Sequence, residues 1–387
     1  MTVEQSLLIR TIKSSVCGVA VVQEAEPDWG EFVKLAGSHG LSAMAYDGLQ
    51  KSNYPLPEKV AQVLHSHYIK AIVRDAQQEH LKNQLQAALV KAGVKHIFLK
   101  GAVLKADYPI PALRTMSDLD VLVYASDFDR ITEVAKALGG NQTPGDGNHR
   151  NFHFPGGVCV EFHPNLLHHA TPIGTGINPG WQYAKETTGC SMELTEEGFY
   201  LNTICHLANH FVAGGVGVRF VLDVWVNRHL RKPEADRSFV ETELERFGLL
   251  DFAQKIEQLA DTWFGDLPMT PLLEELGEYV LTSGSHGKSD RAMLNALSLS
   301  PGGNRFSALM KKAFYPRAEL EDRFPWCKGK PLLLPAAWCA RAYQAVTRHG
   351  HIIADWSKGT GKIDKEEVIQ NQQKMHRFGI RQKDKKK

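Results

Sequence analysis

The pattern of apolar and polar positions divides the chain into a helical region, a β-rich region and a second helical region. Up to about residue 90 the apolar residues recur at helical spacing, most regularly at Leu81, Leu85 and Leu89, which form one stripe before Gly93 ends the helix. Short apolar runs of the kind that form strands follow, and helical spacing returns from Thr195 to about residue 354. This order predicts an α+β fold in which a small mixed sheet is flanked by N-terminal and C-terminal helices.

The β-rich region contains four predicted strands and two predicted helices. The strands cover residues 94–99, the run that holds Asp118 and Asp120, and residues 149–154 and 158–162. The helices cover about 100–108 and 127–138, and a turn-rich loop is expected over 139–148. A Pro-Gly-Gly turn at 155–157 is a plausible hairpin connection between the last two strands.

Asp118 and Asp120 stand out because they interrupt an apolar run. If the run is a strand, its period of two places both carboxylates on one face, roughly 7 Å apart between Cα atoms. Carboxylate pairs of this kind suit Mg²⁺, which prefers oxygen ligands. Glu161 lies in another apolar run, where an ionised side chain needs a partner. Two explanations remain open, a cation shared with the aspartates or a solvated position at a strand end.

Composition narrows the possible partners. The 387 residues allow two or three domains, and 43% hydrophobic with 23% charged residues is typical of a globular protein. A formal net charge of +2 gives no reason to expect a nucleic-acid or membrane surface as partner. The six cysteines form no CxxC pair and are expected to be reduced thiols. No apolar run is long enough to cross a bilayer, so we expect a cytoplasmic protein with no membrane partner.

The second helical region carries two histidines at helical spacing. Its first helix starts with Thr195 in a position typical of a helix cap, and His206 and His210 share one face of it. Leu207 replaces the glutamate of the HExxH zinc signature, so we expect polar contacts at or beside a site rather than a zinc site. Asp223 on the following apolar helix needs a hydrogen-bond partner, and His206 is the expected one.

The order of these motifs resembles a known family. Lys-Gly, Arg, Ser-Asp-Leu-Asp and an alternating Glu-and-His strand follow one another through FLKGAVLKADYPIPALRTMSDLDVLV, VCVEFHPNLL and ICHLANHFVAGGVGVRFVLDVW. Over about residues 81–230 this combination resembles a bacterial family of nucleotidyltransferases in the DNA polymerase β-like superfamily. The resemblance implies a small mixed-sheet nucleotidyltransferase core at 91–170. It is preceded by a helical region at 1–90 and followed by a helical region at 190–354 and a polar, basic tail at 355–387.

The resemblance also implies roles for individual residues. Asp118 and Asp120 become Mg²⁺ ligands, and Glu161 becomes the third carboxylate, either as a metal ligand or as the general base for the acceptor. In the superfamily a Gly-Ser turn contacts the nucleotide phosphates. This chain has Lys100 and Gly101 in place of that turn.

Two explanations of the Lys-Gly turn follow from its chemistry. Gly101 lets a phosphate approach the backbone, and Lys100 and Arg114 supply positive charge for a triphosphate, which makes these three the predicted nucleotide-binding residues. In the alternative, Lys100 pairs with Asp118 or Glu161 in place of a metal and Arg114 braces the acids.

The sequence therefore predicts an enzyme that uses one or two Mg²⁺ ions to move a nucleoside monophosphate from an NTP to an acceptor hydroxyl. ATP is the expected nucleotide, and the acceptor is a small molecule, a protein or an RNA end. A non-catalytic nucleotide-binding or regulatory protein on the same scaffold is one alternative. A hydrolase built on His206, His210 and Asp223 is another.

Overall fold

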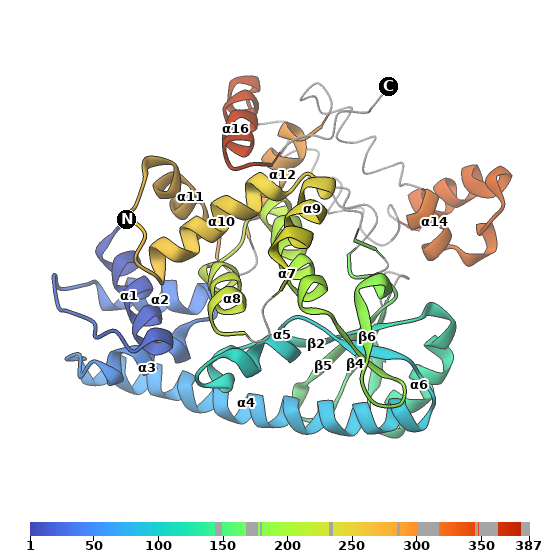
Figure 1. The fold of residues 1–387 in the computed structure, drawn as a ribbon, viewed down its shortest axis with the longest axis horizontal. Helices are drawn as coiled ribbons and strands as arrows, with labels where there is room; N and C mark the ends of the chain where they lie inside the picture. Colours follow the sequence, from blue (N-terminus) through green and yellow to red (C-terminus); the bar gives the residue numbers. More distant parts are fainter. Residues whose placement is uncertain are drawn as a thin grey trace.

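The fold places a mixed sheet between one very long helix and a bundle of C-terminal helices (Figure 1). The computed structural model describes residues 1–143, 149–167, 177–178, 180–231, 235–284, 287–300, 317–344, 347 and 363–380. In the view of Figure 1 the N-terminal helices lie on the left, the sheet on the right, and the C-terminal helices above both. The α+β class predicted from the sequence is confirmed.

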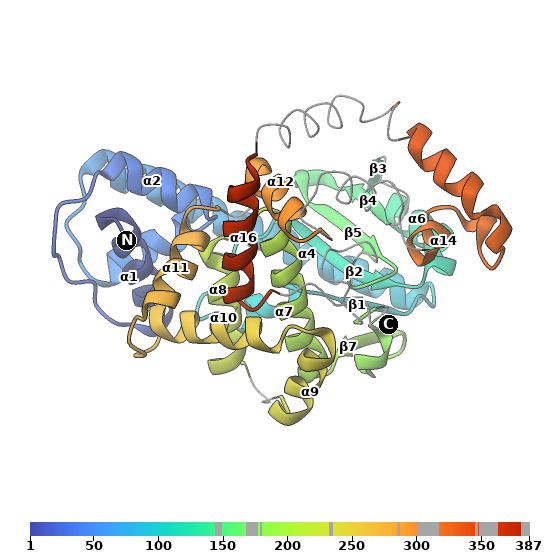
Figure 2. The same ribbon diagram turned by 90° about the horizontal axis from the view of Figure 1, so that it is seen from above.

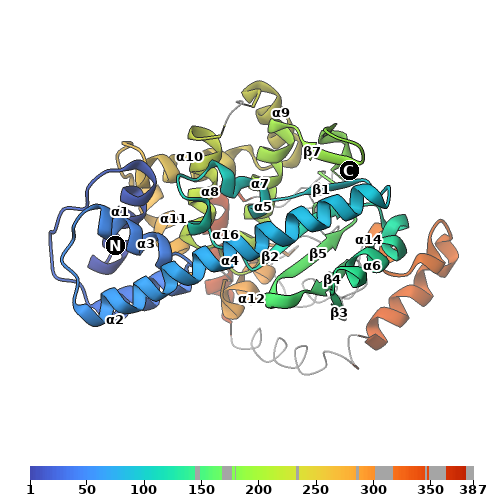
Figure 3. The ribbon, with the colours of Figure 1, turned by 90° about the horizontal axis from the view of Figure 1, so that it is seen from below.

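Four helices build the N-terminal region: α1 (Val3–Cys17), α2 (Trp29–Ser38), α3 (Ser42–Lys51) and α4 (Glu58–Lys91). Helix α4 has 34 residues and runs beneath the whole molecule, from the N-terminal helices to the sheet (Figures 1 and 3). The predicted stripe of Leu81, Leu85 and Leu89 lies on this helix, and the structure shows it buried against the sheet. A fully buried leucine contributes roughly 1.5–3 kcal/mol, so this stripe is a main attachment of α4 to the sheet.

Seven strands form the sheet in the order β3-β4-β5-β2-β1-β7-β6. Strands β2 and β5 are parallel neighbours, β1 and β7 are also parallel, and the other neighbouring pairs are antiparallel. The strand bounds are β1 (His96–Phe98), β2 (Asp118–Val123), β3 (Asn141–Thr143), β4 (Arg150–His153), β5 (Cys159–His163), β6 (Ala184–Glu186) and β7 (Ser191–Leu194).

Strands β1, β2, β4 and β5 confirm the four strands predicted from apolar runs, and β4 and β5 are joined at 155–157 as an antiparallel pair. Strands β3, β6 and β7 were not predicted. They have three or four residues each, and β3 and β6 consist mostly of exposed or half-buried polar side chains, so they carry no apolar pattern. Strand β3 occupies part of the predicted 139–148 loop, of which 144–148 lie outside the described residues.

The two faces of β2 have different neighbours. Leu119, Val121 and Val123 belong to a core that includes α4 and Ile131 of α6 (Phe128–Ala137). Leu122 belongs to the larger core formed with the helices above the sheet. The period of two therefore keeps one face of β2 for packing on α4 and leaves Asp118 and Asp120 on the face toward those upper helices.

The C-terminal helices include α7 (Glu196–Ala213), α8 (Val218–His229), α9 (Arg237–Phe247), α10 (Leu250–Trp263), α11 (Pro271–Leu281), α12 (Ser289–Ser298) and α16 (Lys365–Arg377). Thr195 caps α7 by accepting a hydrogen bond from the backbone N–H of Gly198, as predicted. A short helix α14 (Arg317–Arg323) lies apart from this group (Figure 2).

Helix α16 lies inside the segment predicted as a polar, basic tail. It packs beside α12 and buries Val368 and Met375, and Phe378 just after it joins the main core (Figure 2). The helix has few apolar residues, which explains why its sequence indicates a solvated segment. The final basic residues, 381–387, lie outside the described residues. None of the helices in the described ranges has the length and hydrophobicity that a membrane-spanning segment needs.

Candidate active site

A cavity of about 440 Å³ lies between the sheet and the helices α7 and α8. The six residues predicted for the site all contribute to its wall on the sheet side: Lys100, Gly101, Arg114, Asp118, Asp120 and Glu161. Opposite them, α7 and α8 contribute Thr203, His206, Asn209, His210, Arg219, Phe220 and Asp223. The cavity therefore combines residues that are more than 100 positions apart in the chain.

Three acids enter the cavity from two parallel strands. Asp118 and Asp120 lie two positions apart on β2, and the register pairs Asp120 with Glu161 on β5. Paired positions on neighbouring strands are about 5 Å apart and face the same side of the sheet, so the carboxylates of Asp120 and Glu161 lie close together. Asp118 lines the same cavity two residues earlier on β2, where it is paired with Cys159. The parallel pairing of β2 with β5 is therefore what brings Glu161 beside Asp120.

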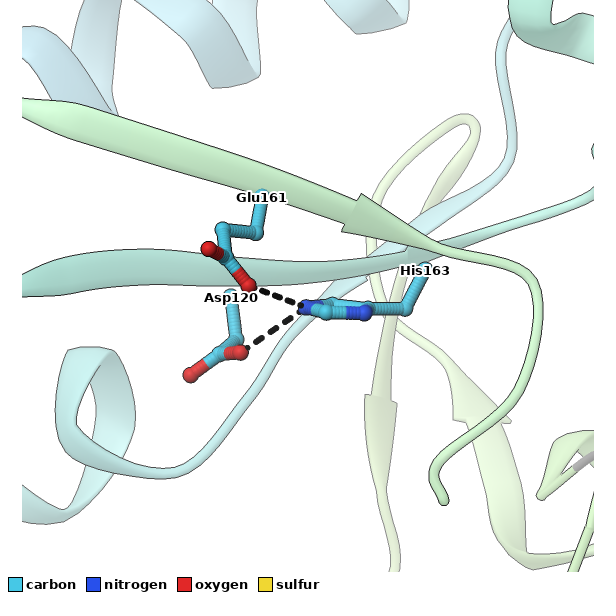
Figure 4. A group of neighbouring side chains, drawn as sticks. All are labelled: Asp120, Glu161 and His163. Atoms are coloured by element: carbon cyan, nitrogen blue, oxygen red, sulfur yellow. Dashed lines mark hydrogen bonds and ion pairs between the residues drawn. The ribbon is translucent and has the colours of Figure 1, made fainter. Parts of the chain in front are cut away.

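His163 joins this group, although sequence analysis assigned it no role. Its Nε2 atom lies 2.9 Å from Oδ1 of Asp120 and 3.4 Å from Oε2 of Glu161, and Figure 4 shows the imidazole pointing between the two carboxylates. One ligand atom from each of the three residues lies within 4.8 Å of the others. The sequence did contain a signal for His163: it follows Glu161 by two residues, a spacing that puts both side chains on one face of a strand.

Lys100 connects β1 with the short helix α5 (Gly101–Leu104) in an unusual backbone conformation. Its φ of 49° and ψ of −121° are rare for a residue with a Cβ atom and cost about 1–3 kcal/mol. Its Nζ atom donates to Oδ1 of Asp120 at 2.8 Å. The structural alternative predicted that Lys100 pairs with Asp118 or Glu161. This prediction is wrong in its partners, because Lys100 pairs with the buried Asp120.

The acids have different protonation tendencies. Burial acts to raise the pKa of Asp120, but the charges and hydrogen bonds of Lys100 and His163 hold that pKa far below its usual range. A hydrogen bond from His163 lowers the pKa of Glu161. Burial and the neighbouring charge of Asp120 raise the pKa of Asp118, whose hydrogen-bond donor is the Ser117 hydroxyl at 2.9 Å. Asp118 is thus the acid with the least compensating positive charge.

Arg114 is held by Asp223 of α8. Its Nε and Nη2 atoms donate to the two carboxylate oxygens at 2.9 and 2.7 Å, and the Tyr108 hydroxyl donates to Oδ1 at 2.6 Å. The third nitrogen, Nη1, lies beside Gly101, where an added Cβ atom would come within 2.1 Å of it. Only glycine fits at position 101 without moving the guanidinium. The observed position of Arg114 therefore requires the glycine of the Lys-Gly turn.

His206 and His210 line the helix side of the cavity, in agreement with the expected polar role near a site. Their Nε2 atoms are 3.0 Å apart, and both rings pack against Phe220. The predicted pair between His206 and Asp223 is wrong, because Asp223 accepts hydrogen bonds from Arg114 and Tyr108 instead. Among the described residues, the three side chains of the alternative hydrolase site form no compact metal-binding group, because Asp223 is bound by Arg114 and Tyr108.

The donor set fits a hard divalent cation. Both hydrogen-bond partners of Asp120 in the described part of the chain use Oδ1, which leaves Oδ2 for a metal. Asp118 contributes a carboxylate whose hydrogen-bond donor, among the residues the structure describes, is the uncharged Ser117, and Glu161 contributes a third carboxylate. This oxygen-rich set matches the preference of Mg²⁺. The assignment of Asp118, Asp120 and Glu161 as metal ligands stays a prediction.

Comparison with known proteins relates the chain to a protein family. The model of the family NTP_transf_5, described as uncharacterised nucleotidyltransferase, matches residues 25–265. The matched segment includes the whole sheet, the cavity and helices α7 to α9. Searches of curated proteins and of solved structures found no match.

Proposed function

The chain belongs to the family described as uncharacterised nucleotidyltransferase, and from this premise we propose that it transfers a nucleoside monophosphate from an NTP to an acceptor hydroxyl with the help of Mg²⁺. ATP is the first nucleotide to test. One observation carries the proposal: Asp120 is paired with Glu161 across parallel strands, in a cavity that also receives Asp118 and Lys100. The same motif order supports membership of the DNA polymerase β-like superfamily.

The proposed reaction is an in-line displacement at the α-phosphorus. A bond forms between the acceptor oxygen and this phosphorus, and the bond from the phosphorus to the oxygen that bridges to the β-phosphate breaks. The acceptor hydroxyl loses its proton to a base, and pyrophosphate leaves with the bridging oxygen. Negative charge builds up on the attacking and leaving oxygens, so the site must supply positive charge and a nearby base.

Five residues of the cavity have a proposed part in this reaction. Asp118, Asp120 and Glu161 would hold Mg²⁺, which when bound offsets the charge of the phosphates. His163 orients Asp120 and Glu161 through its hydrogen bonds, so that Glu161 is ionised and placed to position the acceptor or take its proton. Lys100 would bind the triphosphate and supply positive charge there.

The turn around Gly101 supports the phosphate role. Nη1 of Arg114 lies beside this glycine, and Lys100 precedes it, so two positively charged groups flank a position without a side chain. We propose that the triphosphate approaches the backbone there. Arg114 would contribute through Nη1 alone, because Asp223 holds its other two nitrogens.

A second candidate function is supported by the ion pairs of Asp120. Lys100 and His163 already compensate its charge, so the fold balances the buried acid without an added cation. A protein that binds a nucleotide and transfers nothing is compatible with such a site. Its role would be sensing or regulation rather than catalysis.

Labelled nucleotides test the proposed function directly. The full-length protein would be incubated with each NTP labelled at the α-phosphate, with Mg²⁺ or EDTA, and with a cell lysate as source of acceptors. We expect label to move into one fraction, small molecule, protein or RNA, only with Mg²⁺ and with release of pyrophosphate. Calorimetry that shows ATP binding without label transfer in any fraction would contradict catalysis and favour the second candidate.

A further inference from the structure

Arg219 is a charged residue of the cavity that, in the described part of the chain, shares its only counter-ion with Arg114. It lies in the first turn of α8, lines the cavity, and has a side chain that is 19% exposed. Within the described residues its one ionic partner is Asp223, at 3.5 Å between Nη1 and Oδ2. Its guanidinium also lies 5.0 Å from the ring centre of Phe220. These contacts hold the side chain at the cavity but leave its charge poorly compensated.

The weak compensation follows from competition for Asp223. Arg114 binds both oxygens of this carboxylate at 2.9 and 2.7 Å, so one negative charge serves two guanidinium groups. Burial lowers the pKa of Arg219, and the charge of Arg114 lowers it further. On the opposite wall, Asp118 is the acid with the least compensation. The cavity thus has two guanidinium groups around the single carboxylate of Asp223 and, on the sheet side, an incompletely compensated acid at Asp118.

The position of Arg219 at the N-terminus of α8 makes its positive charge less favourable still. The N-terminus of a helix carries a partial positive charge, which disfavours a cation in the first turn. Arg219 is there, and the first turn of α8 contains no acidic residue to offset it. A half-buried arginine that shares its partner and lies at the positive end of a helix offers a favourable position for an anionic ligand.

We propose that Arg219 binds the triphosphate of the nucleotide from the helix wall, opposite the acids. The inference rests on the proposed function, because it assigns the ligand of the same cavity. Arg114 keeps only Nη1 for such a ligand, whereas the planar fork of Arg219 matches the spacing of phosphate oxygens. The triphosphate would then be bound at two places: at one end by Mg²⁺ held by the carboxylates of the sheet, and at the other end by Arg219.

Binding of inorganic tripolyphosphate tests the inference without any transfer. Calorimetry would compare the full-length protein with Arg219→Gln and Arg219→Lys. Arg228→Gln serves as the matched control, because Arg228 lies on the same helix outside the cavity, has a side chain 23% exposed and pairs with Asp261. Thermal unfolding of each variant would show that it is folded.

We expect Arg219→Gln to weaken tripolyphosphate binding about tenfold or more, which is the usual loss for a charge-assisted hydrogen bond. Arg219→Lys keeps the charge but not the fork, so its loss is smaller. The control should bind within about twofold of the parent protein, a difference too small for the loss of a direct contact. Equal binding by the parent protein and a folded Arg219→Gln, or no binding by the parent protein, would overturn the inference.

Kinetics separate this inference from the proposed function. If transfer occurs, Arg219→Gln should raise KM for the NTP and leave KM for the acceptor unchanged. A rise confined to the acceptor would assign the arginine to the other substrate and overturn the inference. If transfer is absent but tripolyphosphate binding still depends on Arg219, the inference stands and the proposed function fails.

Discussion

Asp118 and Asp120 are two positions apart on one strand, yet their surroundings differ. Asp120 is buried and accepts hydrogen bonds from Lys100 and His163, which keep it ionised. Asp118 is half-buried, and its burial together with the nearby charge of Asp120 raises its pKa. In the protein without metal, Asp120 is therefore part of a stabilising ion-pair group, whereas Asp118 is under electrostatic strain that a cation would relieve.

This difference predicts opposite effects of two matched substitutions. Asp118→Asn removes a repelled charge and should leave the free energy of unfolding without Mg²⁺ unchanged or higher, with the Ser117 hydrogen bond kept. Asp120→Asn leaves Lys100 and His163 without their carboxylate and should cost about 1–3 kcal/mol. Urea unfolding measures both. Equal losses in the two variants would contradict the assigned environments.

Both substitutions should also remove the effect of Mg²⁺. A ligand that binds only the folded protein raises its stability, so Mg²⁺ is expected to raise the Tm of the parent protein but not of either variant. Label transfer should be lost in both variants while they stay folded. A variant that keeps the Mg²⁺-induced rise in Tm would exclude that residue as a metal ligand.

At the scale of elements, helix α4 holds the beginnings of both acid-bearing strands. Arg74 donates to the carbonyl oxygens of Gly156 and Gly157 before β5 at 3.0 and 2.9 Å, and to that of Ser117 before β2 at 3.3 Å. Gln78 donates to the carbonyl of Met116 at 3.0 Å. The helix thereby fixes where β2 and β5 start, and with them the relative position of Asp118 and Glu161.

Loss of the Arg74 contacts should loosen the site more than the fold. Arg74→Gln removes three hydrogen bonds of a partly exposed side chain, for an expected loss of about 1 kcal/mol in unfolding free energy. We expect faster amide hydrogen exchange at 117–118 and 157–159, and about tenfold slower transfer, since small misplacement of reacting groups is costly.

The exposed Lys70 on the same helix provides a control, as Lys70→Gln should leave exchange at both segments unchanged. Unaltered exchange in Arg74→Gln would show that the strand ends do not depend on this side chain. The exchange measurement needs no substrate, so it tests the positioning role separately from the proposed function.

At the scale of the whole molecule, His39 joins the N-terminal helices to the C-terminal ones. It follows α2, is fully buried, and its Nδ1 accepts a hydrogen bond from the backbone N–H of Val218 at the start of α8. Its Nε2 is 3.1 Å from the carbonyl of Leu281 at the end of α11. Because Nδ1 is an acceptor here, Nε2 carries the proton and the ring is neutral.

This contact predicts lower stability in acid. Burial lowers the pKa of His39 below 6.5, so at lower pH the unfolded chain binds a proton that the folded protein does not. The free energy of unfolding should fall as pH decreases from about 6.5 toward the folded pKa, by up to about 1.4 kcal/mol per pH unit for this group.

His39→Gln isolates this contribution from those of other histidines. The variant should be about 1–3 kcal/mol less stable at pH 7, because a buried hydrogen bond is lost. Its stability should then fall less steeply between pH 7 and 5 than that of the parent protein. Denaturant unfolding at several pH values checks this, and parallel curves would contradict a neutral, buried His39.

Local patterns in the sequence were enough to predict the main secondary structure. The leucine stripe of α4, the cap of α7 and the four longer or more apolar strands follow from periodicity and capping, which act over a few residues. The shared face of Asp118 and Asp120 follows from the same rule. Short polar strands and α16 were missed, because neighbouring segments rather than their own residues stabilise them.

The partners of the charged side chains were decided only by the tertiary structure. Lys100 pairs with Asp120, Arg114 with Asp223, and Arg219 reaches the same cavity from a helix about 100 residues after Asp120. An ion pair depends on distance in space, and many residues of opposite charge are available in the sequence. The sequence by itself therefore determined which carboxylates share a strand face, whereas the folded chain decided which charges compensate one another and which remain for a ligand.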